Sequence, residues 1–305
     1  MAKKGKLKTN LEYFAARFVL AMLGLLPPSV AMAVGQMFGT LAYFVAGNLR
    51  KTGLRNLELA FPEKTLDERR ALLKGCFLNL GRVLGLFSQL SARSADSLRA
   101  LIAPEGIAHL EQAKAEGKPL ILFTAHLGAW ELTSFGLSLI GHPFSFLVRR
   151  IDNPAVEELV DEIRMRFGNQ TMDKLAAARS MVRLLKSGQV LGLLLDLNVL
   201  DDEGIFVDFF GVPASTNFIT AKLALRTGST ILPVFAPWDK QRKKFLLQVQ
   251  PRVTTELTGD EETDVRRLTE KLSLIIENEI RNYPDQWLWI HKRWKTRPPG
   301  EPSIY

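Results

Sequence analysis

Cysteine is nearly absent from this chain, which has one, Cys76, among 305 residues. A single thiol excludes an internal disulfide framework and favours a reducing compartment. Cys76 lies in a segment with the apolar periodicity of a helix. We therefore interpret it as a buried residue and not as a nucleophile.

Motifs that bind metals or nucleotides are missing as well. Four histidines and one cysteine supply few soft ligands, and the zinc pattern His-Glu-x-x-His does not occur. The phosphate-binding pattern Gly-x-Gly-x-x-Gly is also absent. We expect neither a bound metal nor a cofactor.

Acidic residues are outnumbered by basic ones. The chain has 40 lysines and arginines against 32 aspartates and glutamates, which gives a formal net charge of +8. An excess of this size predicts an anionic partner, which is a nucleic acid, an acidic lipid or an acidic protein.

Charge of either sign is absent from residues 29–47, close to the amino terminus. These nineteen residues are just enough to cross a bilayer. A cleaved signal peptide is the alternative, because residues 31–33 read Ala-Met-Ala, like a cleavage site. The apolar run continues for more than ten residues beyond that point, so we reject cleavage.

Basic segments flank this apolar region on both sides. Residues 1–8 contain four lysines, and Arg50-Lys51 follows the apolar run. Because both flanks are basic, the orientation of a single membrane crossing is ambiguous. A shallow hairpin, or an in-plane helix bent at Pro27-Pro28, keeps both flanks on one face of the membrane. We predict an apolar helical membrane anchor over residues 1–49 and a second domain over residues 50–305. The alternative is a buried helix of a soluble domain.

Strands and helices alternate through the rest of the chain. Short apolar runs bounded by breakers predict strands, and apolar periodicity of 3.6 residues predicts helices. Their alternation predicts an α/β fold with a central, mostly parallel sheet flanked by helices. The predicted strands are residues 120–123, 143–148, 190–195, 230–235 and 244–250; the predicted helices are 65–89, 98–117, 153–168, 175–187, 217–227 and 264–283, with a basic connector over 50–62.

The first of these strands leads into the most distinctive segment of the chain, Thr-Ala-His-Leu-Gly-Ala-Trp-Glu from Thr124 to Glu131. Gly128 permits a tight turn into a helix that begins near Trp130. His126 is therefore predicted at the carboxyl end of a central strand, where open α/β sheets bind their ligands.

Glu131 follows His126 by five residues, in the first turn of the predicted helix. From there its carboxylate can reach back to one imidazole nitrogen and leave the other free as a base. No serine or cysteine accompanies the pair, so the site would activate a hydroxyl of the substrate. The structural alternative is a hydrogen-bonded histidine at a strand end and a glutamate that suits the helix dipole.

Two other predicted strands also end in polar residues. Arg149 and Arg150 end one, and Asp196 ends the other. The carboxyl ends of parallel strands converge, so we expect these side chains in one crevice with His126. Arg149 or Arg150 is a candidate to stabilise an oxyanion or hold a phosphate, the alternative being a surface charge pair. Asp196 either positions the substrate or caps its strand.

Aromatic residues gather in two places. Phe209 and Phe210 precede a tight turn and a helix start at Asn217, and they either wall an acyl groove or anchor an ordinary loop. Residues 286–297 interleave three tryptophans with four cations, Arg293 among them. That composition suits single-stranded nucleic acid or a lipid headgroup interface, and the apolar amino end favours the membrane interface.

Several of these segments occur together, and in the same order, in one protein family. From about residue 10 to its end the chain resembles the bacterial lipid A biosynthesis acyltransferases, the late lauroyl and myristoyl transferases of the inner membrane. The motif His-x4-Glu alone is shared with glycerolipid acyltransferases, but its combination with the carboxyl-terminal block is specific. One departure is Leu197-Asn198, where family members often have glutamine after the aspartate. The matching blocks are Arg55-Asn56-Leu57 with Phe61-Pro62-Glu63, His126 and Glu131 with Trp130, Arg149 with Asn153-Pro154, Asp196, Phe209-Phe210-Gly211-x-Pro213-Ala214, and residues 289–298.

The resemblance implies a glycerolipid-acyltransferase-like fold, with residues 50–305 as the acyltransferase domain. It also implies transfer of a fatty acyl group from acyl carrier protein, or from coenzyme A, to a hydroxyl of a lipid A precursor. His126 is then the base, Glu131 its orienter and Arg149 an oxyanion ligand. The further candidates for substrate binding are Arg150, Asp196, Phe209, Phe210, Asn217 and Arg293.

A location and a set of partners follow from the same resemblance. The enzyme is expected at the cytoplasmic face of the bacterial inner membrane, where a cytosolic acyl donor meets a lipid acceptor, and a nucleic acid is not expected as a partner. The alternative is an acyltransferase of the same fold with another acceptor, such as lysophosphatidate, an ornithine lipid or a phosphatidylinositol mannoside.

Overall fold

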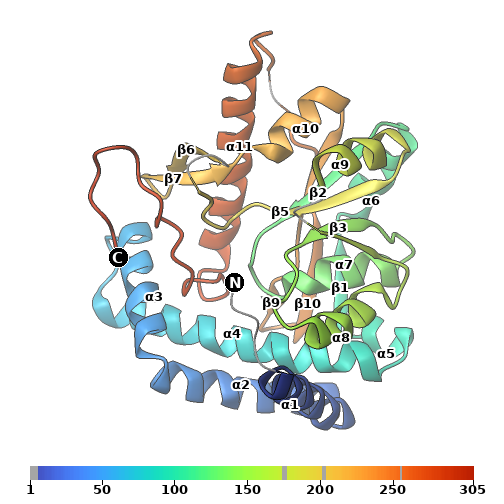
Figure 1. Ribbon diagram of the computed structural model, residues 1–305, viewed down its shortest axis with the longest axis vertical. Helices are drawn as coiled ribbons and strands as arrows, with labels where there is room; N and C mark the ends of the chain where they lie inside the picture. The colour runs from blue at the N-terminus through green and yellow to red at the C-terminus, as the bar shows by residue number, and fades with distance from the viewer. Residues whose placement is uncertain (1–5, 174–176, 201–203, 255) are drawn as a thin grey trace.

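A central β-sheet organises the computed structural model of the chain, which describes residues 6–173, 177–200, 204–254 and 256–305 (Figure 1). Within these residues the sheet has eight strands, in the order β1-β10-β8-β2-β5-β3-β4 with β9 beside β10. The strands are β1 (Ile102–Glu105), β2 (Leu120–Thr124), β3 (Ser145–Val148), β4 (Gln170–Asp173), β5 (Val190–Leu194), β8 (Thr230–Phe235), β9 (Trp238–Asp239) and β10 (Lys244–Val249).

The sheet is mostly parallel, which confirms the prediction. β2 lies at its centre, parallel to β5 on one side and to β8 on the other. β3 continues the parallel order towards β4, and antiparallel pairing joins β10 to β8 and to β9. Residues 120–123 of β2 are buried, as expected of a parallel strand that is covered on both faces.

Helices cover both faces of this sheet, as Figure 1 shows. They are α1 (Lys6–Leu25), α2 (Pro28–Val45), α3 (Gly47–Ala60), α4 (Leu66–Ala92), α5 (Ala95–Arg99), α6 (Ile107–Ala115), α7 (Trp130–Leu139), α8 (Pro154–Met165), α9 (Ala177–Lys186), α10 (Ile219–Thr227) and α11 (Glu261–Asn282). Side chains alternate along β2. Ile121 and Phe123 belong to a core shared with α9, α10 and α11, whereas Leu120 and Leu122 belong to a core shared with α4, α6, α7 and α8.

Several segments differ from the predicted elements. The helix predicted over residues 98–117 is wrong, because strand β1 interrupts it. β1 pairs only with β10, at the edge of the sheet, and an edge strand tolerates Pro104. The predicted connector over residues 50–62 is mostly the helix α3. Strand β4 and the hairpin of β6 (Gly204–Phe209) and β7 (Val212–Asn217) have no counterpart among the predicted strands.

The two amino-terminal helices are docked on the rest of the chain. α2 runs along α4, and glycines lie where the two backbones meet (Figure 1). A Cβ atom on Gly81 would come within 2.1 Å of the carbonyl oxygen of Gly35, so only glycine fits there. The Nε2 of Gln89, on α4, donates to the carbonyl oxygen of Leu23 at 2.9 Å and holds the end of α1. The predicted domain boundary at residue 49 falls inside α3.

Large apolar side chains cover the outer surfaces of α1 and α2. A surface of this kind marks a protein or membrane contact when it is contiguous. By length and composition alone, α2 and α4 are also able to cross a membrane, although half of the apolar window in α4 is buried in the protein. The exposed residues are Leu11, Phe14, Phe18, Met22, Leu25, Val30, Met37, Phe38, Leu41, Phe44 and Val45.

Gly81→Ala tests the contact between α2 and α4. We expect it to lower the free energy of unfolding by about 1–3 kcal/mol, because the added methyl group meets backbone that cannot rotate away. Thermal unfolding in detergent measures the change. Gly47→Ala is the matched control, since a Cβ atom there has no neighbour within 4 Å. Equal melting temperatures for the two variants would contradict the close packing.

Candidate active site

His126 lies in a tight turn between β2 and α7, at the carboxyl end of the central strand. Gly128 has φ +60°, and a Cβ atom on it would lie 2.3 Å from the carbonyl oxygen of Ala236, so the turn requires glycine. Backbone hydrogen bonds hold the turn from two sides: Gly128 N–H donates to the carbonyl oxygen of Gln286 at 3.0 Å, and Leu288 N–H donates to that of His126 at 3.1 Å.

The imidazole of His126 is oriented by Asp196. Its Nδ1 lies 2.9 Å from Oδ1 of Asp196, and its backbone N–H donates to Oδ2, also at 2.9 Å. Trp287 Nε1–H donates to the same Oδ2 at 2.8 Å. A carboxylate only accepts hydrogen bonds, so Nδ1 carries the proton and Nε2 is left with its lone pair. This is the geometry of a base and its orienter.

The pKa values of both groups reflect this contact. Burial alone would lower the pKa of His126, but the Asp196 carboxylate, with help from Glu131, more than offsets burial and raises it. Burial alone would raise the pKa of Asp196, but the imidazole and the hydrogen bonds from His126 and Trp287 lower it. Asp196 is only 1% exposed, so its charge acts on His126 with little screening.

Glu131 does not orient the imidazole as predicted; its carboxylate is paired with Arg164 of α8. Arg164 Nη2 donates to Oε1 of Glu131 at 2.6 Å and Nε donates to Oε2 at 3.1 Å, a two-point contact between α7 and α8. The reach of Glu131 was predicted from spacing alone, which does not reveal a competing cation 33 residues further on. No sequence pattern matches Arg164 to Glu131, because the four acidic residues of α8 itself lie closer to Arg164 along the chain.

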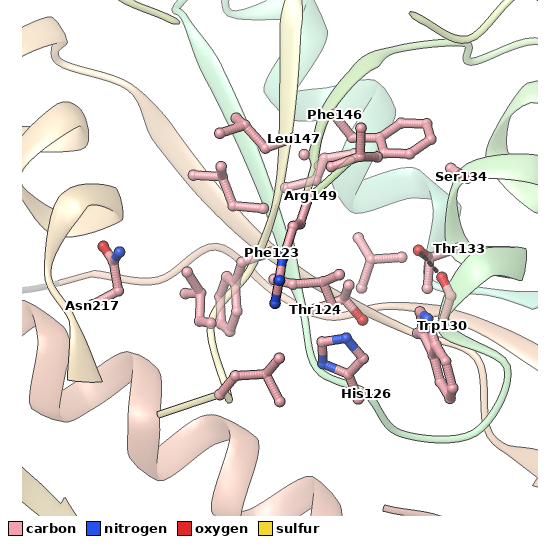
Figure 2. Close-up of a pocket in the computed structure, with 18 of the residues that line it drawn as sticks. Phe123, Thr124, His126, Trp130, Thr133, Ser134, Phe146, Leu147, Arg149 and Asn217 are labelled. Atoms are coloured by element: carbon pink, nitrogen blue, oxygen red, sulfur yellow. Dashed lines mark hydrogen bonds between the residues drawn. The ribbon is translucent and has the colours of Figure 1, made fainter. Parts of the chain in front are cut away.

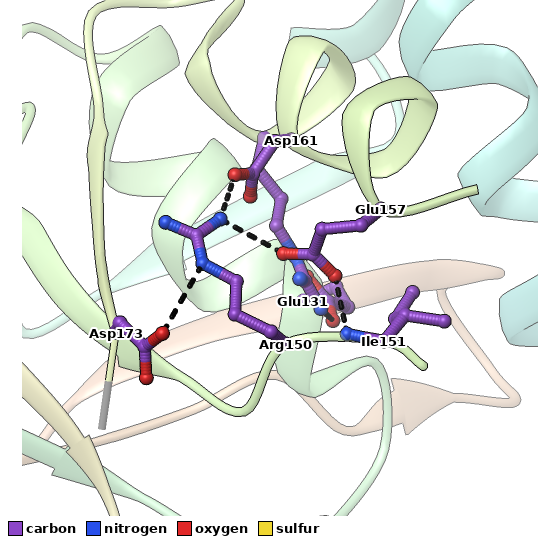
Figure 3. Close-up of polar contacts among 7 residues, drawn as sticks. Glu131, Arg150, Ile151, Glu157, Asp161 and Asp173 are labelled. Carbon is purple, nitrogen blue, oxygen red and sulfur yellow. Dashed lines mark hydrogen bonds and ion pairs between the residues drawn. The ribbon is translucent and has the colours of Figure 1, made fainter. Parts of the chain in front are cut away.

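The two candidate arginines at the end of β3 lie in different surroundings. Arg149 is exposed and lines a cavity beside His126, and Figure 2 shows its guanidinium directed towards that imidazole. Arg150 points the other way, into an acidic cluster (Figure 3). Its Nη1 donates to Glu157 at 2.8 Å and also contacts Asp161. Arg150 therefore forms a surface charge pair, which is the alternative considered for one of the two arginines.

The cavity has a volume of about 780 Å³, within the usual range of about 300–1,000 Å³ for ligand sites. It opens where the sheet divides. β3 pairs with β5 only at Ser145 with Leu191 and at Phe146 with Gly192, whereas β2 stays paired with β5 as far as Leu194. Beyond Gly192 the strands β3 and β5 are unpaired, and side chains that follow on both strands line the cavity.

Apolar side chains from both faces of the sheet form the walls of this cavity. Leu122, Phe144 and Phe146 contribute from the side of α7, and Phe123, Met181 and Leu193 from the side of α9. Gly192 lies between the two sets, and a Cβ atom there would come within 2.4 Å of the Phe144 ring. The charged or titratable side chains that line the cavity form its polar end, and they are His126, Glu131, Arg149, Arg164 and His291.

Asn217 and His291 also line the cavity. Asn217 Oδ1 accepts from Ile219 N–H at 2.7 Å and helps to start α10. His291 Nε2 accepts from the backbone N–H of Asn198 at 3.1 Å, and burial lowers its pKa to about 4. His291 is therefore neutral at physiological pH. In the sequence His291 lies in the carboxyl-terminal block, where no pattern assigned it to the site.

The aromatic candidates do not line the cavity. Phe209 and Phe210 are buried and pack on Trp287, Trp289 and Phe61. The prediction of an acyl groove at this turn is therefore wrong, and the alternative of core anchors holds. Both hydrophobic rings are held inside because burying them is worth about 1.5–3 kcal/mol each.

The carboxyl-terminal block is likewise core and not an interface. Trp287, Trp289 and Trp294 are each 0% exposed. Arg293, 1% exposed, donates from Nη1 to the carbonyl oxygen of Ser215 at 2.6 Å and from Nη2 to Thr216 Oγ1. It fixes β7 and does not line the cavity. Composition alone predicted an exposed membrane contact here, and burial overrides it.

In the part of the chain that the structure describes, no group of three or more histidine, cysteine, aspartate or glutamate side chains could hold a metal ion. Cys76, the lone thiol, is buried as predicted, and burial raises its pKa to about 12. A thiol with that pKa is not ionised at neutral pH and does not act as a nucleophile.

Comparison with known proteins gives matches over nearly the whole chain. The family model described as bacterial lipid A biosynthesis acyltransferase matches residues 2–296. The lipid A biosynthesis lauroyltransferase of Escherichia coli (strain K12) is 29% identical over 315 residues, 97% of this chain and 100% of the relative. The lipid A biosynthesis palmitoleoyltransferase of the same organism is 28% identical over 308 residues, 98% of each chain, and its lipid A biosynthesis myristoyltransferase is 23% identical over 286 residues, 94% of this chain and 87% of the relative.

The family match includes the turn that carries His126, the strand end that carries Asp196 and most of the carboxyl-terminal block. Those segments meet at one apolar cavity in the fold. This chain therefore belongs to the bacterial lipid A biosynthesis acyltransferases and is an O-acyltransferase.

Proposed function

We propose that this enzyme moves a fatty acyl group from the thioester of an acyl carrier protein, or of coenzyme A, directly onto a hydroxyl of a lipid A precursor. The observation that carries the proposal is the His126–Asp196 pair at the polar end of an apolar cavity. The relatives are named as lauroyl, palmitoleoyl and myristoyl transferases of lipid A biosynthesis, which supports this choice of acceptor.

In this mechanism His126 Nε2 removes the proton from the acceptor hydroxyl as its oxygen attacks the thioester carbonyl. Asp196 holds the imidazole in the required tautomer and stabilises the imidazolium that forms, as its hydrogen bonds to the ring and to the backbone suit it to do. The thiol leaves when the tetrahedral intermediate collapses, and the imidazolium returns the proton to it.

Arg149 and the Glu131–Arg164 pair supply charge around the reacting atoms. Arg149 has no hydrogen bond or ion pair with any described residue and is free to meet an oxyanion or a phosphate. Arg164 is committed to Glu131, so we assign this pair to positioning. It joins the first turn of α7, next to His126, to α8.

The direct mechanism requires no acyl-enzyme. The chain's single thiol is buried with a pKa of about 12, and the walls of the cavity are apolar enough to hold an acyl chain beside the base. Both substrates are therefore present together during transfer.

The exposed apolar surfaces of α1 and α2 support seating of the enzyme on the membrane. We assign these surfaces to the bilayer and the crevice to the cytoplasmic side, where a carrier protein is available. Because α2 packs against α4 through backbone contacts, an in-plane arrangement keeps this packing intact, whereas a crossing would pull α2 away from α4.

His126→Ala tests the base. We expect acyl transfer to a lipid A precursor in detergent to fall by roughly two to four orders of magnitude, since the hydroxyl loses its proton acceptor. Matched folding is checked by circular dichroism, and Cys76→Ala, which keeps the base, is the control. Near-wild-type turnover by His126→Ala would exclude the direct mechanism. If the native enzyme prefers lysophosphatidate to the lipid A precursor, the proposed acceptor is wrong.

Asp196→Asn tests the orienter through the pH profile. The raised pKa of His126 keeps the imidazole protonated until the pH passes above 6.5, so kcat/KM of the native enzyme rises with pH through that region. Without the carboxylate charge, burial dominates and the pKa falls, so the midpoint moves to lower pH while kcat drops. The exposed Asp67→Asn is the control. An unchanged midpoint in Asp196→Asn would show that Asp196 does not act on His126.

Phe18→Asp combined with Met37→Asp tests membrane seating. Both side chains are more than 60% exposed in the free protein, and burying two such side chains in a bilayer is worth about 3–6 kcal/mol. We expect the double variant to move from the membrane fraction to the soluble fraction in high salt. Leu274→Asp, at an exposed leucine of α11, should stay with the membrane. Full retention of the double variant would place the membrane contact elsewhere.

A further inference from the structure

Helix α9 carries three cations on one face. Arg179, Arg183 and Lys186 are spaced four and three residues apart, so they project from the same side of the helix. All three are exposed, and the structure gives them no hydrogen bond or ion pair with any residue it describes. Two arginines elsewhere are paired by contrast, Arg164 with Glu131 and Arg226 with Glu261.

The opposite face of α9 belongs to the active site. Met181 and Leu185 are buried in the core, and Met181 lines the cavity that holds His126. A single helix thus separates the three cations from the cavity wall. A partner bound to the outer face of α9 is held one helix diameter, about 10–12 Å, from the cavity.

Neighbouring elements extend the positive surface towards the cavity. Lys222 of α10 places its Nζ 5.6 Å from the centre of the Phe218 ring, and Phe218 lines the cavity. Arg149, at the end of β3, is exposed and also lines it. Cations from three elements therefore lie beside the crevice, and this arrangement favours a partner with several negative charges.

The position of α9 separates this surface from the bilayer. In Figure 1, α1 and α2 lie at the bottom of the molecule and α9 lies in its upper right part, beyond the sheet. A bilayer that takes the apolar surfaces of α1 and α2 does not reach α9. The partner that fits is therefore soluble and acidic, and not a lipid headgroup.

We propose that the outer face of α9, with Arg179, Arg183 and Lys186, is the docking surface for the acidic carrier protein that delivers the acyl thioester. This proposal rests on the proposed function, since it names the face that the donor occupies. Charge complementarity on such a surface speeds encounter and fixes orientation more than it adds to chemistry. Removing the docking charges should therefore change KM and the salt dependence of the rate, and leave kcat unchanged.

The test is the double charge reversal Arg183→Glu with Lys186→Glu. For acyl carrier protein as the donor we expect KM to rise about tenfold with kcat unchanged. We also expect added salt to slow the native enzyme and to have no such effect on the double variant. With a short acyl-pantetheine thioester as donor, which lacks the protein, both constants should match the native enzyme. Arg183→Lys keeps the charge and should retain the native KM.

Lys118→Glu is the matched control, because Lys118 is equally exposed but precedes β2, at the opposite end of the sheet from His126. Fluorescence anisotropy of labelled carrier protein measures docking without catalysis. If the native protein binds the carrier but transfers no acyl group, the proposed function fails while the docking face stands. If the double reversal binds the carrier as tightly as Lys118→Glu does, or loses affinity only for anionic vesicles, the docking face is wrong.

Discussion

The buried carboxylate of Asp196 connects the parts of this structure that would otherwise be independent. It follows β5 and accepts hydrogen bonds from the backbone and imidazole of His126, after β2, and from the indole of Trp287 near the carboxyl end. A buried charge is tolerated only when it is paired, and removing one partner of such a pair costs about 3–5 kcal/mol. The same contacts that stabilise this junction also fix the tautomer of His126.

The carboxyl-terminal segment holds the early helices against this junction. Asn56 Nδ2 of α3 donates to the carbonyl oxygens of Trp289 and His291, each at 2.6 Å. Asn79 Nδ2 of α4 donates to that of Gly128 at 3.0 Å. One buried amide therefore ties α3 to the carboxyl-terminal segment, and the other ties α4 to the turn that carries His126. The three tryptophans fill the space between them, which explains why the aromatic residues of a segment of interfacial composition are buried.

The sequence predicted what depends on local patterns. The strand predicted over residues 120–123 and the helix predicted over residues 65–89 have local signals and occur close to their predicted bounds. Proximity across the sheet was also predictable, because parallel strands converge at one edge, and this brought Asp196 and Arg149 to His126. Pairing within that group was not predictable. Asp196 meets the imidazole across the ends of the neighbouring strands β5 and β2, and Arg164 of α8 meets Glu131 of α7. Neither pairing has a local sequence signal, because each joins residues far apart in the chain. The prediction that Phe209 and the tryptophans are exposed was wrong, because burial depends on packing between segments far apart in the chain.

Backbone contact at Gly35 and Gly81 leaves α2 without a hinge relative to α4. An enzyme on a flexible tether samples many tilts above a lipid surface and must find a productive one at each encounter. If the apolar surfaces of α1 and α2 enter the bilayer as we propose, this enzyme would take one tilt when it lands, and its crevice would open at one height above the lipid plane. An acceptor hydroxyl would then be selected by its depth in the leaflet as well as by its chemistry.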